Sequence, residues 1–374
     1  TTLIEKEPQV LPYVLDREMA AVVERELTRQ DVTVKTNCAT TKIEVDAEGN
    51  PVVHTDGGET ITADYVFVCL GVHPEVGLAK EAGLEIGSTG AIKIDRHMRT
   101  SDEHIYAGGD CVETINQITG QPMFIPMGSL ANRHGRVIAE NLAGRESSFP
   151  GAVGAFLVKV YDANIGAVGL SERAAAAQGL NVSSLWGTFP DKPDYYPESQ
   201  TFVLKMTYES GTGRLLGLQA VGKGDICRRI DVFSSLLQHG GTIQSLLDFE
   251  QGYAPPYSEA LDPLFHLGCM AEARESGTVF VSPGIAYDSA DVQFVDVREE
   301  AEFTGESWSE PRPGWEAINI PLNDLRERVG DLDRSKRTVI LCKRGPRSFQ
   351  AAQILRAAGF SQVEILAGGL QSQQ

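Results

Sequence analysis

The chain has 374 residues, 42% of them hydrophobic, which suits roughly two to four globular domains. Its net charge of −18 argues against nucleic acid or an anionic membrane as the main partner. The six cysteines are scattered and form no Cys-x-x-Cys pair, so we expect neither a disulfide framework nor a metal site. No apolar run is long enough to cross a bilayer and the first residues lack the features of a signal peptide, which predicts a cytoplasmic protein.

Residues 1–75 have the pattern of the later part of a nucleotide-binding α/β domain. Strands are predicted at 2–5, 33–45 and 52–55, and an amphipathic helix at 16–29. Residues 64–70 form a near-continuous apolar run, typical of a strand buried on both faces, which Gly71 ends. Glu5 stands at the end of the first strand, where an acid binds ribose hydroxyls and repels a 2′-phosphate. The sequence therefore favours NADH over NADPH.

Residues 76–149 contain a second nucleotide-binding pattern. A predicted apolar strand, Ile-Tyr-Ala, leads into Gly108, Gly109 and Asp110. Glycines allow a ligand to approach the backbone closely, and a carboxylate accepts hydrogen bonds from sugar-like hydroxyls. A helix is predicted to begin at Gly128, and the amides at its N-terminus, near Met127, Gly128 and Ala131, would stabilise negative charge on a bound ligand.

Residues 150–272 change in composition. A hairpin is predicted from strands at 202–208 and 215–221, and helices at 225–239 and 243–249. Two Gly-x-x-Gly segments, 151–154 and 166–169, are interpreted as turns because neither fits a dinucleotide-binding loop. Two prolines after Tyr253 fix an extended backbone and hold the phenols of Tyr253 and Tyr257 in place. Tyr195 and Tyr196 are weaker candidates for a second phenol, and residues 272–278 are the predicted linker to the last domain.

The strongest chemical signal is the segment 342–348, Cys-Lys-Arg-Gly-Pro-Arg-Ser. It lies between a predicted strand at 338–341 and a predicted helix at 348–358. The glycine and proline let the loop turn its backbone N–H groups toward the sulfur, and the helix presents the positive end of its dipole. Both effects favour a thiolate, so Cys342 is predicted to be a nucleophile.

Together with residues 294–299, 317–321 and 366–370, this loop resembles a rhodanese domain, here residues 278–374. The resemblance implies that Cys342 carries sulfane sulfur as a persulfide. It also implies a sulfur-binding loop that contains Lys343, Arg344, Gly345, Arg347 and Ser348. Four residues separate Cys342 from Arg347, which suits an adduct of sulfur size.

The preceding part resembles the pyridine nucleotide-disulfide oxidoreductases, in particular the group of coenzyme A-disulfide reductases and NADH-dependent persulfide reductases. Residues 67–74 and the Gly-Gly-Asp motif carry this resemblance, as do residues 221–224, 229–232 and 249–258. It implies FAD bound by Gly109, Asp110, Met127, Gly128 and Ala131, and NADH bound near Glu5 and Gly71. It further implies a homodimer in which Tyr253 of the 150–272 dimerisation domain acts in the active site of the other subunit.

The expected fold is α/β: a partial two-dinucleotide-domain flavoprotein (1–75 and 76–149), an α+β dimerisation domain and a rhodanese-like domain. The family begins with a glycine-rich FAD loop and a redox cysteine, and neither occurs here, so we expect an N-terminally truncated piece of a longer enzyme. The expected function is reduction of coenzyme A disulfide or persulfide by NADH and FAD, fused to sulfur transfer. Two alternatives stay open: an NADH oxidase or peroxidase of the same fold, or a sulfur-transfer or interaction module with an inactive reductase remnant.

Overall fold

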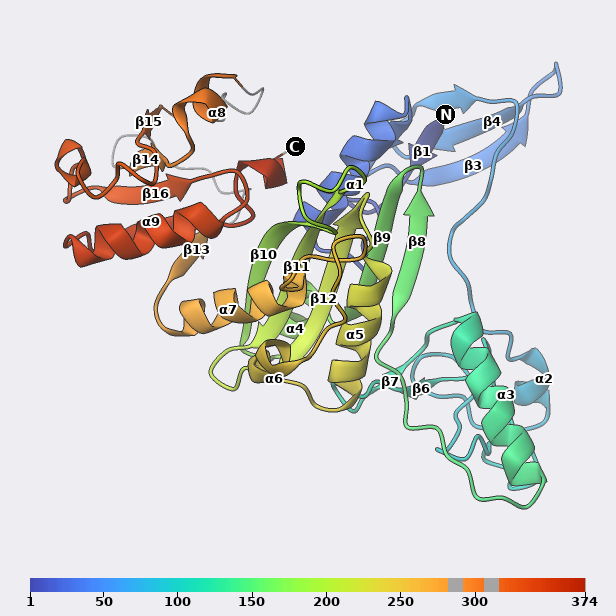
Figure 1. Cartoon of the computed structure of the whole chain (residues 1–374). Helices are drawn as coiled ribbons and strands as arrows, with labels where there is room; N and C mark the ends of the chain where they lie inside the picture. Colours follow the sequence, from blue (N-terminus) through green and yellow to red (C-terminus); the bar gives the residue numbers. More distant parts are fainter. Residues whose placement is uncertain (282–291, 306–315, 374) are drawn as a thin grey trace. The chain divides into compact units, whose positions relative to one another are not determined.

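The computed structural model describes residues 1–281, 292–305 and 316–373 (Figure 1). The chain divides into two compact units. The first comprises Thr1–Thr36, Phe156–Leu236 and Gly240–Gln374, and the second comprises Asn37–Ala155 with Leu237–His239. Within the described ranges, no helix has the length and apolar character needed to cross a membrane.

A five-stranded antiparallel sheet is the centre of the first unit (Figure 1). Its order is β10-β11-β12-β9-β8, with bounds Val182–Pro190, Thr201–Glu209, Leu215–Gly222, Ala163–Gly169 and Phe156–Val160. The predicted hairpin is confirmed as β11 and β12. The turn predicted at 166–169 is wrong, because these residues lie inside β9. A Cβ on Gly166 would lie 2.7 Å from the Ile230 side chain, so a larger residue there would force that side chain to shift.

Four helices accompany this sheet: α4 (Glu172–Ala177), α5 (Cys227–Gln238), α6 (Ile243–Asp248) and α7 (Pro263–Glu275). The predicted helices near 225–239 and 243–249 are confirmed. The predicted linker at 272–278 is wrong in its first part, because α7 continues to Glu275. Ser276 is the C-cap of that helix, and the next residue, Gly277, has a φ of 92°, a conformation that suits glycine.

The N-terminal segment packs on the same sheet. β1 (Thr2–Ile4) pairs in parallel with β2 (Thr33–Lys35), and α1 (Arg17–Arg29) connects them. Met19 and Val23 of α1 share one hydrophobic core with Trp186 of β10 and Val203 of β11. The strand predicted at 33–45 is interrupted, since Asn37 adopts a φ of 51° that a strand cannot accommodate.

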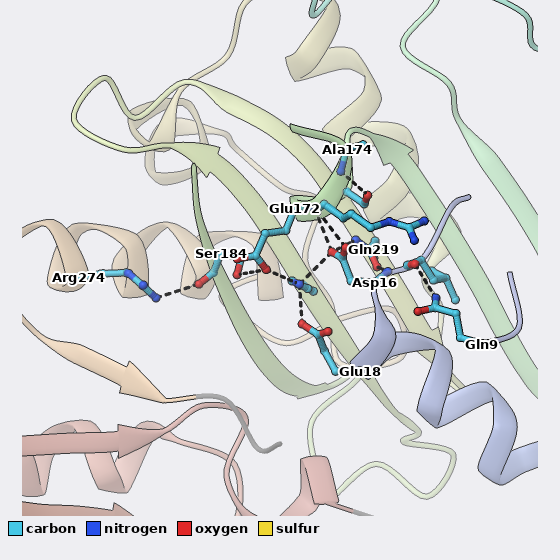
Figure 2. A network of polar contacts seen from close by, with 12 residues as sticks. Gln9, Asp16, Glu18, Glu172, Ala174, Ser184, Gln219 and Arg274 are labelled. Atoms are coloured by element: carbon cyan, nitrogen blue, oxygen red, sulfur yellow. Dashed lines mark hydrogen bonds and ion pairs between the residues drawn. The ribbon is translucent and has the colours of Figure 1, made fainter. Parts of the chain in front are cut away.

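A network of polar contacts that includes Asp16, Glu18, Glu172 and Gln219 connects the start of α1 to the sheet (Figure 2). Lys205 of β11 is 1% exposed, and its Nζ lies 2.9 Å from Asp16, 2.5 Å from Glu18 and 2.6 Å from Glu172. The Asp16 carboxylate also accepts hydrogen bonds from Gln219 and from the backbone N–H of Glu172. Buried charge costs little only when it is paired in this way, so the cluster specifies how the N-terminal segment docks.

The C-terminal part of the first unit is a parallel sheet in the order β13-β17-β16-β14-β15. The strands are Val279–Val281, Val363–Leu366, Arg337–Leu341, Val292–Asp296 and Ala317–Asn319. The helices are α8 (Glu300–Gly305) and α9 (Pro346–Ala357), with short 3₁₀ turns at Val329–Asp331 and Leu370–Gln373. The strand and helix predicted on either side of Cys342 are confirmed as β16 and α9.

The second unit has little regular sheet. It contains β3 (Thr40–Val45), β4 (Pro51–Thr55) and β5 (Thr60–Thr62) in one antiparallel sheet, and the short pair β6 (Thr114–Ile115) and β7 (Pro122–Met123). Its helices are α2 (Gly77–Glu81) and α3 (Gly128–Leu142). The helix predicted from Gly128 is thereby confirmed. Small cores around Met98 and Ile92 hold this unit together.

Two predicted strands of this unit are wrong. Residues 64–70 have no regular secondary structure, and Phe67 is 88% exposed. A strand buried on both faces needs neighbours to accept its backbone hydrogen bonds, and no described strand pairs with this run. Residues 105–107 make only one bridge, Tyr106 with Arg99, because the chain turns tightly at Met98, whose φ is 68°.

Candidate functional site

Cys342 follows directly after β16 and is 1% exposed. Its Sγ accepts a hydrogen bond from the backbone N–H of Gly345 at 3.0 Å. Gly345 has a φ of 126°, which only glycine adopts without strain, and Pro346 occupies the first turn of α9. The loop therefore directs a backbone N–H at the sulfur through a conformation that its own sequence specifies.

A second backbone segment, which follows Gly369, hydrogen-bonds with this loop. The N–H of Leu370 donates to the carbonyl of Cys342 at 2.9 Å, and the N–H of Gln371 donates to the carbonyl of Lys343 at 3.0 Å. A Cβ on Gly369 would lie 2.5 Å from the Arg344 nitrogen. The Gly-Gly pair in residues 366–370 thus allows two backbone segments to approach closely, which gives that part of the motif a physical role.

Arg347 and Ser348 lie in the first turn of α9. The guanidinium of Arg347 donates two hydrogen bonds to Glu302 of α8, one of them at 2.8 Å. This pairing lowers the pKa of Glu302 to about 2 and raises the pKa of Arg347. The Ser348 hydroxyl is buried and has no hydrogen-bond partner within the described part of the chain. Sequence reasoning missed Glu302, which lies 45 residues before its partner.

The Asp-Val-Arg motif at the end of β14 stabilises the end of the neighbouring strand β16. Arg298 and Asp296 form a buried ion pair at 2.8 Å, and Asn319 donates to the carbonyls of both residues. The N–H of Val297 donates to the carbonyl of Leu341 at 2.9 Å. These bonds fix the end of β16, from which Cys342 projects.

Arg344 connects the sulfur loop to the segment between β10 and β11. Its Nη2 lies 2.7 Å from the Asp194 carboxylate, and its Nε donates to the Gln371 side chain at 3.0 Å. Asp194 lies 150 residues from Arg344 in the sequence. No local sequence signal identifies such a partner, so Asp194 was missed.

A pocket of about 270 Å³ lies beside the same loop. Apolar and aromatic side chains dominate its lining: Phe189, His266, Met270, Phe280, Phe349 and Leu366. Glu259 and Arg344 are the charged residues in that lining. Burial lowers the pKa of His266, and burial also raises the pKa of Cys269, which lines the pocket too. The pocket therefore combines a mostly apolar surface with one acidic and one basic side chain.

Tyr253 is 50% exposed, and its phenol lies near the phenol of Tyr195. Desolvation raises the pKa of the Tyr195 phenol, and the neighbouring Tyr253 raises it further. Tyr195 directly follows Asp194, the partner of Arg344. The structure thus brings together two phenols that the sequence singled out. One of them is the sequence neighbour of Asp194, which contacts the sulfur loop.

The predicted flavin residues Gly109 and Ala131 are also close to each other. The N–H of Gly109 donates to Nδ1 of His134 on α3 at 3.1 Å, and a Cβ on Gly109 would lie 3.7 Å from Ala131. His134 is buried and its Nε2 has no partner within the described residues. Asp110 is exposed, Met127 is the extended N-cap of α3 and Gly128 is its first residue. Sequence reasoning missed His134.

Glu5 and Gly71, the two residues predicted near NADH, belong to different compact units. Glu5 follows β1, and one of its carboxylate oxygens accepts a hydrogen bond from the N–H of Glu7 at 2.9 Å. Gly71 has a φ of 93° and open space where a Cβ would lie. Among the residues that the structure describes, no group of His, Cys, Asp or Glu side chains is arranged to hold a metal ion.

Three family models match the chain. They are the pyridine nucleotide-disulphide oxidoreductase over residues 1–129, its dimerisation domain over 156–264, and the rhodanese-like domain over 286–373. Two solved structures align with 99% of the chain. One is a NAD-dependent persulfide reductase from A. fulgidus, 40% identical, 67% of its length covered and TM-score 0.92. The other is reduced Bacillus anthracis CoADR-RHD, 31% identical, 65% covered and TM-score 0.88.

Among curated proteins, the NAD(P)H sulfur oxidoreductase (CoA-dependent) of Pyrococcus furiosus is 39% identical over 266 residues, 71% of this chain and 59% of that protein. The chain thus spans about three fifths of the length of the curated relatives it matches. The expected fold class is confirmed. The chain belongs to the pyridine nucleotide-disulphide oxidoreductase family, with that family's dimerisation domain and a C-terminal rhodanese-like domain.

Proposed function

We propose that the chain takes part in the FAD-dependent reduction of coenzyme A disulfide or coenzyme A persulfide (polysulfide) by NADH, and that its C-terminal domain transfers sulfane sulfur. The observation that carries this proposal is the Cys342 loop, in which a backbone N–H points at a cysteine sulfur at the start of a helix. The activities for which the relatives are named support the same substrate class, since they are persulfide reduction and CoA-dependent sulfur reduction.

The sulfur-transfer step follows from this geometry. The Cys342 thiolate attacks the outer sulfur of a persulfide R–S–SH, a new S–S bond to Cys342 forms, and the R–S bond to that sulfur breaks. The electron pair leaves with R–S⁻, which takes a proton from solvent, so no external oxidant or reductant is needed. The N–H of Gly345 and the N-terminus of α9 stabilise negative charge on the sulfur before and after transfer.

The residues around Gly109 fit a flavin. Gly108 lets the turn pack closely against His134 and Ile138 of α3, the N-cap of α3 makes no side-chain hydrogen bond to the helix, and the buried Nε2 of His134 has no partner among the described residues. Asp110 would hold the ribityl hydroxyls, while Met127, Gly128 and Ala131 would lie beside the flavin ring. FAD supplies the transfer of two electrons from NADH to a sulfur–sulfur bond. For NADH itself, Glu5 would bind the ribose hydroxyls and Gly71 would let the nicotinamide part approach.

Tyr253 is proposed as the proton donor to the leaving thiol, acting in a homodimer through the dimerisation domain. The Tyr195 phenol lies near Tyr253 and gives this part of the site a second hydroxyl. A cytoplasmic location stays a prediction from the sequence.

The alternatives explain less of the chain. An NADH oxidase or peroxidase would leave the Cys342 loop, with its three supporting segments, outside the main reaction. If the chain were only a sulfur-transfer module with an inactive reductase remnant, the turn at Gly109 and its hydrogen bond to His134 of α3 would have no cofactor to bind.

The test separates the two activities in the native protein. Cys342→Ser should abolish sulfur transfer to cyanide, a loss beyond ~10³-fold because a hydroxyl is a far poorer nucleophile. Tyr253→Phe should slow NADH-dependent reduction of coenzyme A disulfide or persulfide by ~10²–10⁴-fold while sulfur transfer to cyanide stays near wild type. Sulfur transfer that survives Cys342→Ser, or a change below about threefold in Tyr253→Phe, would refute the corresponding role.

A further inference from the structure

The sulfur loop contains three basic side chains, yet two of them are already paired with carboxylates. Arg344 contacts Asp194 at 2.7 Å, and Arg347 donates twice to Glu302. Thiosulfate-like sulfur donors are dianions, and a dianion needs unpaired cations or N–H groups at the site to offset its lost hydration. In this loop, such a donor must compete with built-in carboxylates for both arginines.

The Asp194 carboxylate lies 2.7 Å from the Arg344 guanidinium and is 64% exposed. A carboxylate beside Arg344 disfavours a small dianion at the same guanidinium. Glu259 also lines the pocket, and burial together with the charge of Asp194 raises its pKa, whereas Arg344 opposes that shift.

The pocket next to the loop favours uncharged, apolar ligand atoms. Its lining side chains Phe189, Met270, Phe280 and Phe349 offer an apolar surface in a volume of about 270 Å³. Burial of apolar ligand atoms in such a space is favourable, and the cation in its lining, Arg344, is already paired with Asp194.

We propose that the donor to Cys342 is an organic persulfide whose atoms next to the sulfur are uncharged and largely apolar, and that Asp194 is a specificity-determining residue that disfavours thiosulfate-like dianions. This inference rests on the proposed role of Cys342 as the sulfur acceptor. Asp194 acts by occupying Arg344, and the apolar pocket takes the body of the donor. With thiosulfate, the Cys342 thiolate would instead displace sulfite, which carries away the electron pair of the broken S–S bond.

The experiment compares two donors in the full chain: thiosulfate and the persulfide of N-acetylcysteamine, which is neutral apart from its sulfur. The measured quantity is the ratio of their kcat/KM values for sulfur transfer to cyanide. Asp194→Asn should raise the ratio of thiosulfate to persulfide by about threefold or more, since one charge near a dianion is removed at a partly screened site. Asp331→Asn removes a carboxylate from an exposed ion pair with Arg328 in the same domain and should leave the ratio unchanged.

A second variant tests whether the change in Asp194→Asn acts through Arg344 or through a wider change in the protein. In the Asp194→Asn background, Arg344→Gln should return the ratio to the wild-type value or below, because the gain requires the released guanidinium. An unchanged ratio in Asp194→Asn, or a gain that survives Arg344→Gln, would overturn the inference. Failure of the proposed function has a different signature, in which Cys342→Ser retains transfer from both donors.

Discussion

The sulfur loop and the Gly108–Asp110 turn are both short motifs, but they differ in how much of a site lies close by in the sequence. Around Cys342, the strand, the loop and the helix follow one another from Arg337 to Ala357. The Gly109 turn contacts α3, whereas Glu5, predicted to serve the same electron-transfer reaction, belongs to the other compact unit. A motif whose nucleophile and backbone N–H donor are neighbours in the sequence shows its chemistry there, while a dispersed site depends on long-range contacts.

The Lys205 cluster is a third case, in which long-range contacts alone hold the residues together, and substitution there should have the largest effect on stability. Lys205→Met would leave the carboxylates of Asp16, Glu18 and Glu172 without their shared cation. We expect a loss of ~3–5 kcal/mol in the free energy of unfolding, measured by denaturant titration. Lys223→Met, which removes an exposed lysine paired with Asp162, should cost less than about 1 kcal/mol. Equal losses in the two variants would contradict the role of the buried cluster.

The same cluster should make stability depend on pH. Burial raises the pKa of Asp16, but Lys205 and the hydrogen bonds from Gln219 and Glu172 lower it further, so the net shift is downward. The stability that Asp16 contributes is therefore present above the unfolded-state pKa of about 4 and is lost as pH falls through the folded-state pKa. In Lys205→Met this acid-dependent loss should be smaller.

Asp110→Ala tests the dispersed site with an intermediate effect. Loss of the charged acceptor should weaken FAD binding in the native protein by ~1–3 kcal/mol, measured by flavin fluorescence. Glu103→Ala, on the same segment and with an exposed side chain, is the matched control and should bind FAD as the wild type does. An unchanged FAD affinity in Asp110→Ala would remove this residue from the cofactor site.

Glu302→Gln tests the local site with the smallest effect. The folded-state pKa of Glu302 is about 2 against an ordinary value of 4.5, so its contribution is complete above pH 4.5 and is lost as pH falls toward 2. The pair with Arg347 is partly exposed, so we expect only about 1 kcal/mol. Thermal unfolding between pH 5 and 2 should show a flatter pH dependence in the variant; an identical slope would contradict the pairing.

Sequence patterns predicted the elements whose causes are local. The hairpin of β11 and β12, the helix from Gly128 and the strand and helix around Cys342 all follow from periodicity and turn residues. Glu302, Asp194 and the carboxylates around Lys205 could not be predicted, because ion pairs between distant residues leave no local signal. The apolar run at 64–70 misled for the same reason, since a buried strand exists only where other strands pair with it.

The central claim is that Cys342 carries the sulfur, and the most direct measurement is peptide mass spectrometry after a brief incubation with a neutral organic persulfide. We predict the mass of one added sulfur atom on the peptide that contains Cys342, and none on that peptide in Cys342→Ser. Cys227 is more exposed, but burial and the charges of Asp225 and Asp231 raise its pKa, so it should react more slowly. Added sulfur on Cys69 or Cys227 with Cys342 unmodified would contradict the account.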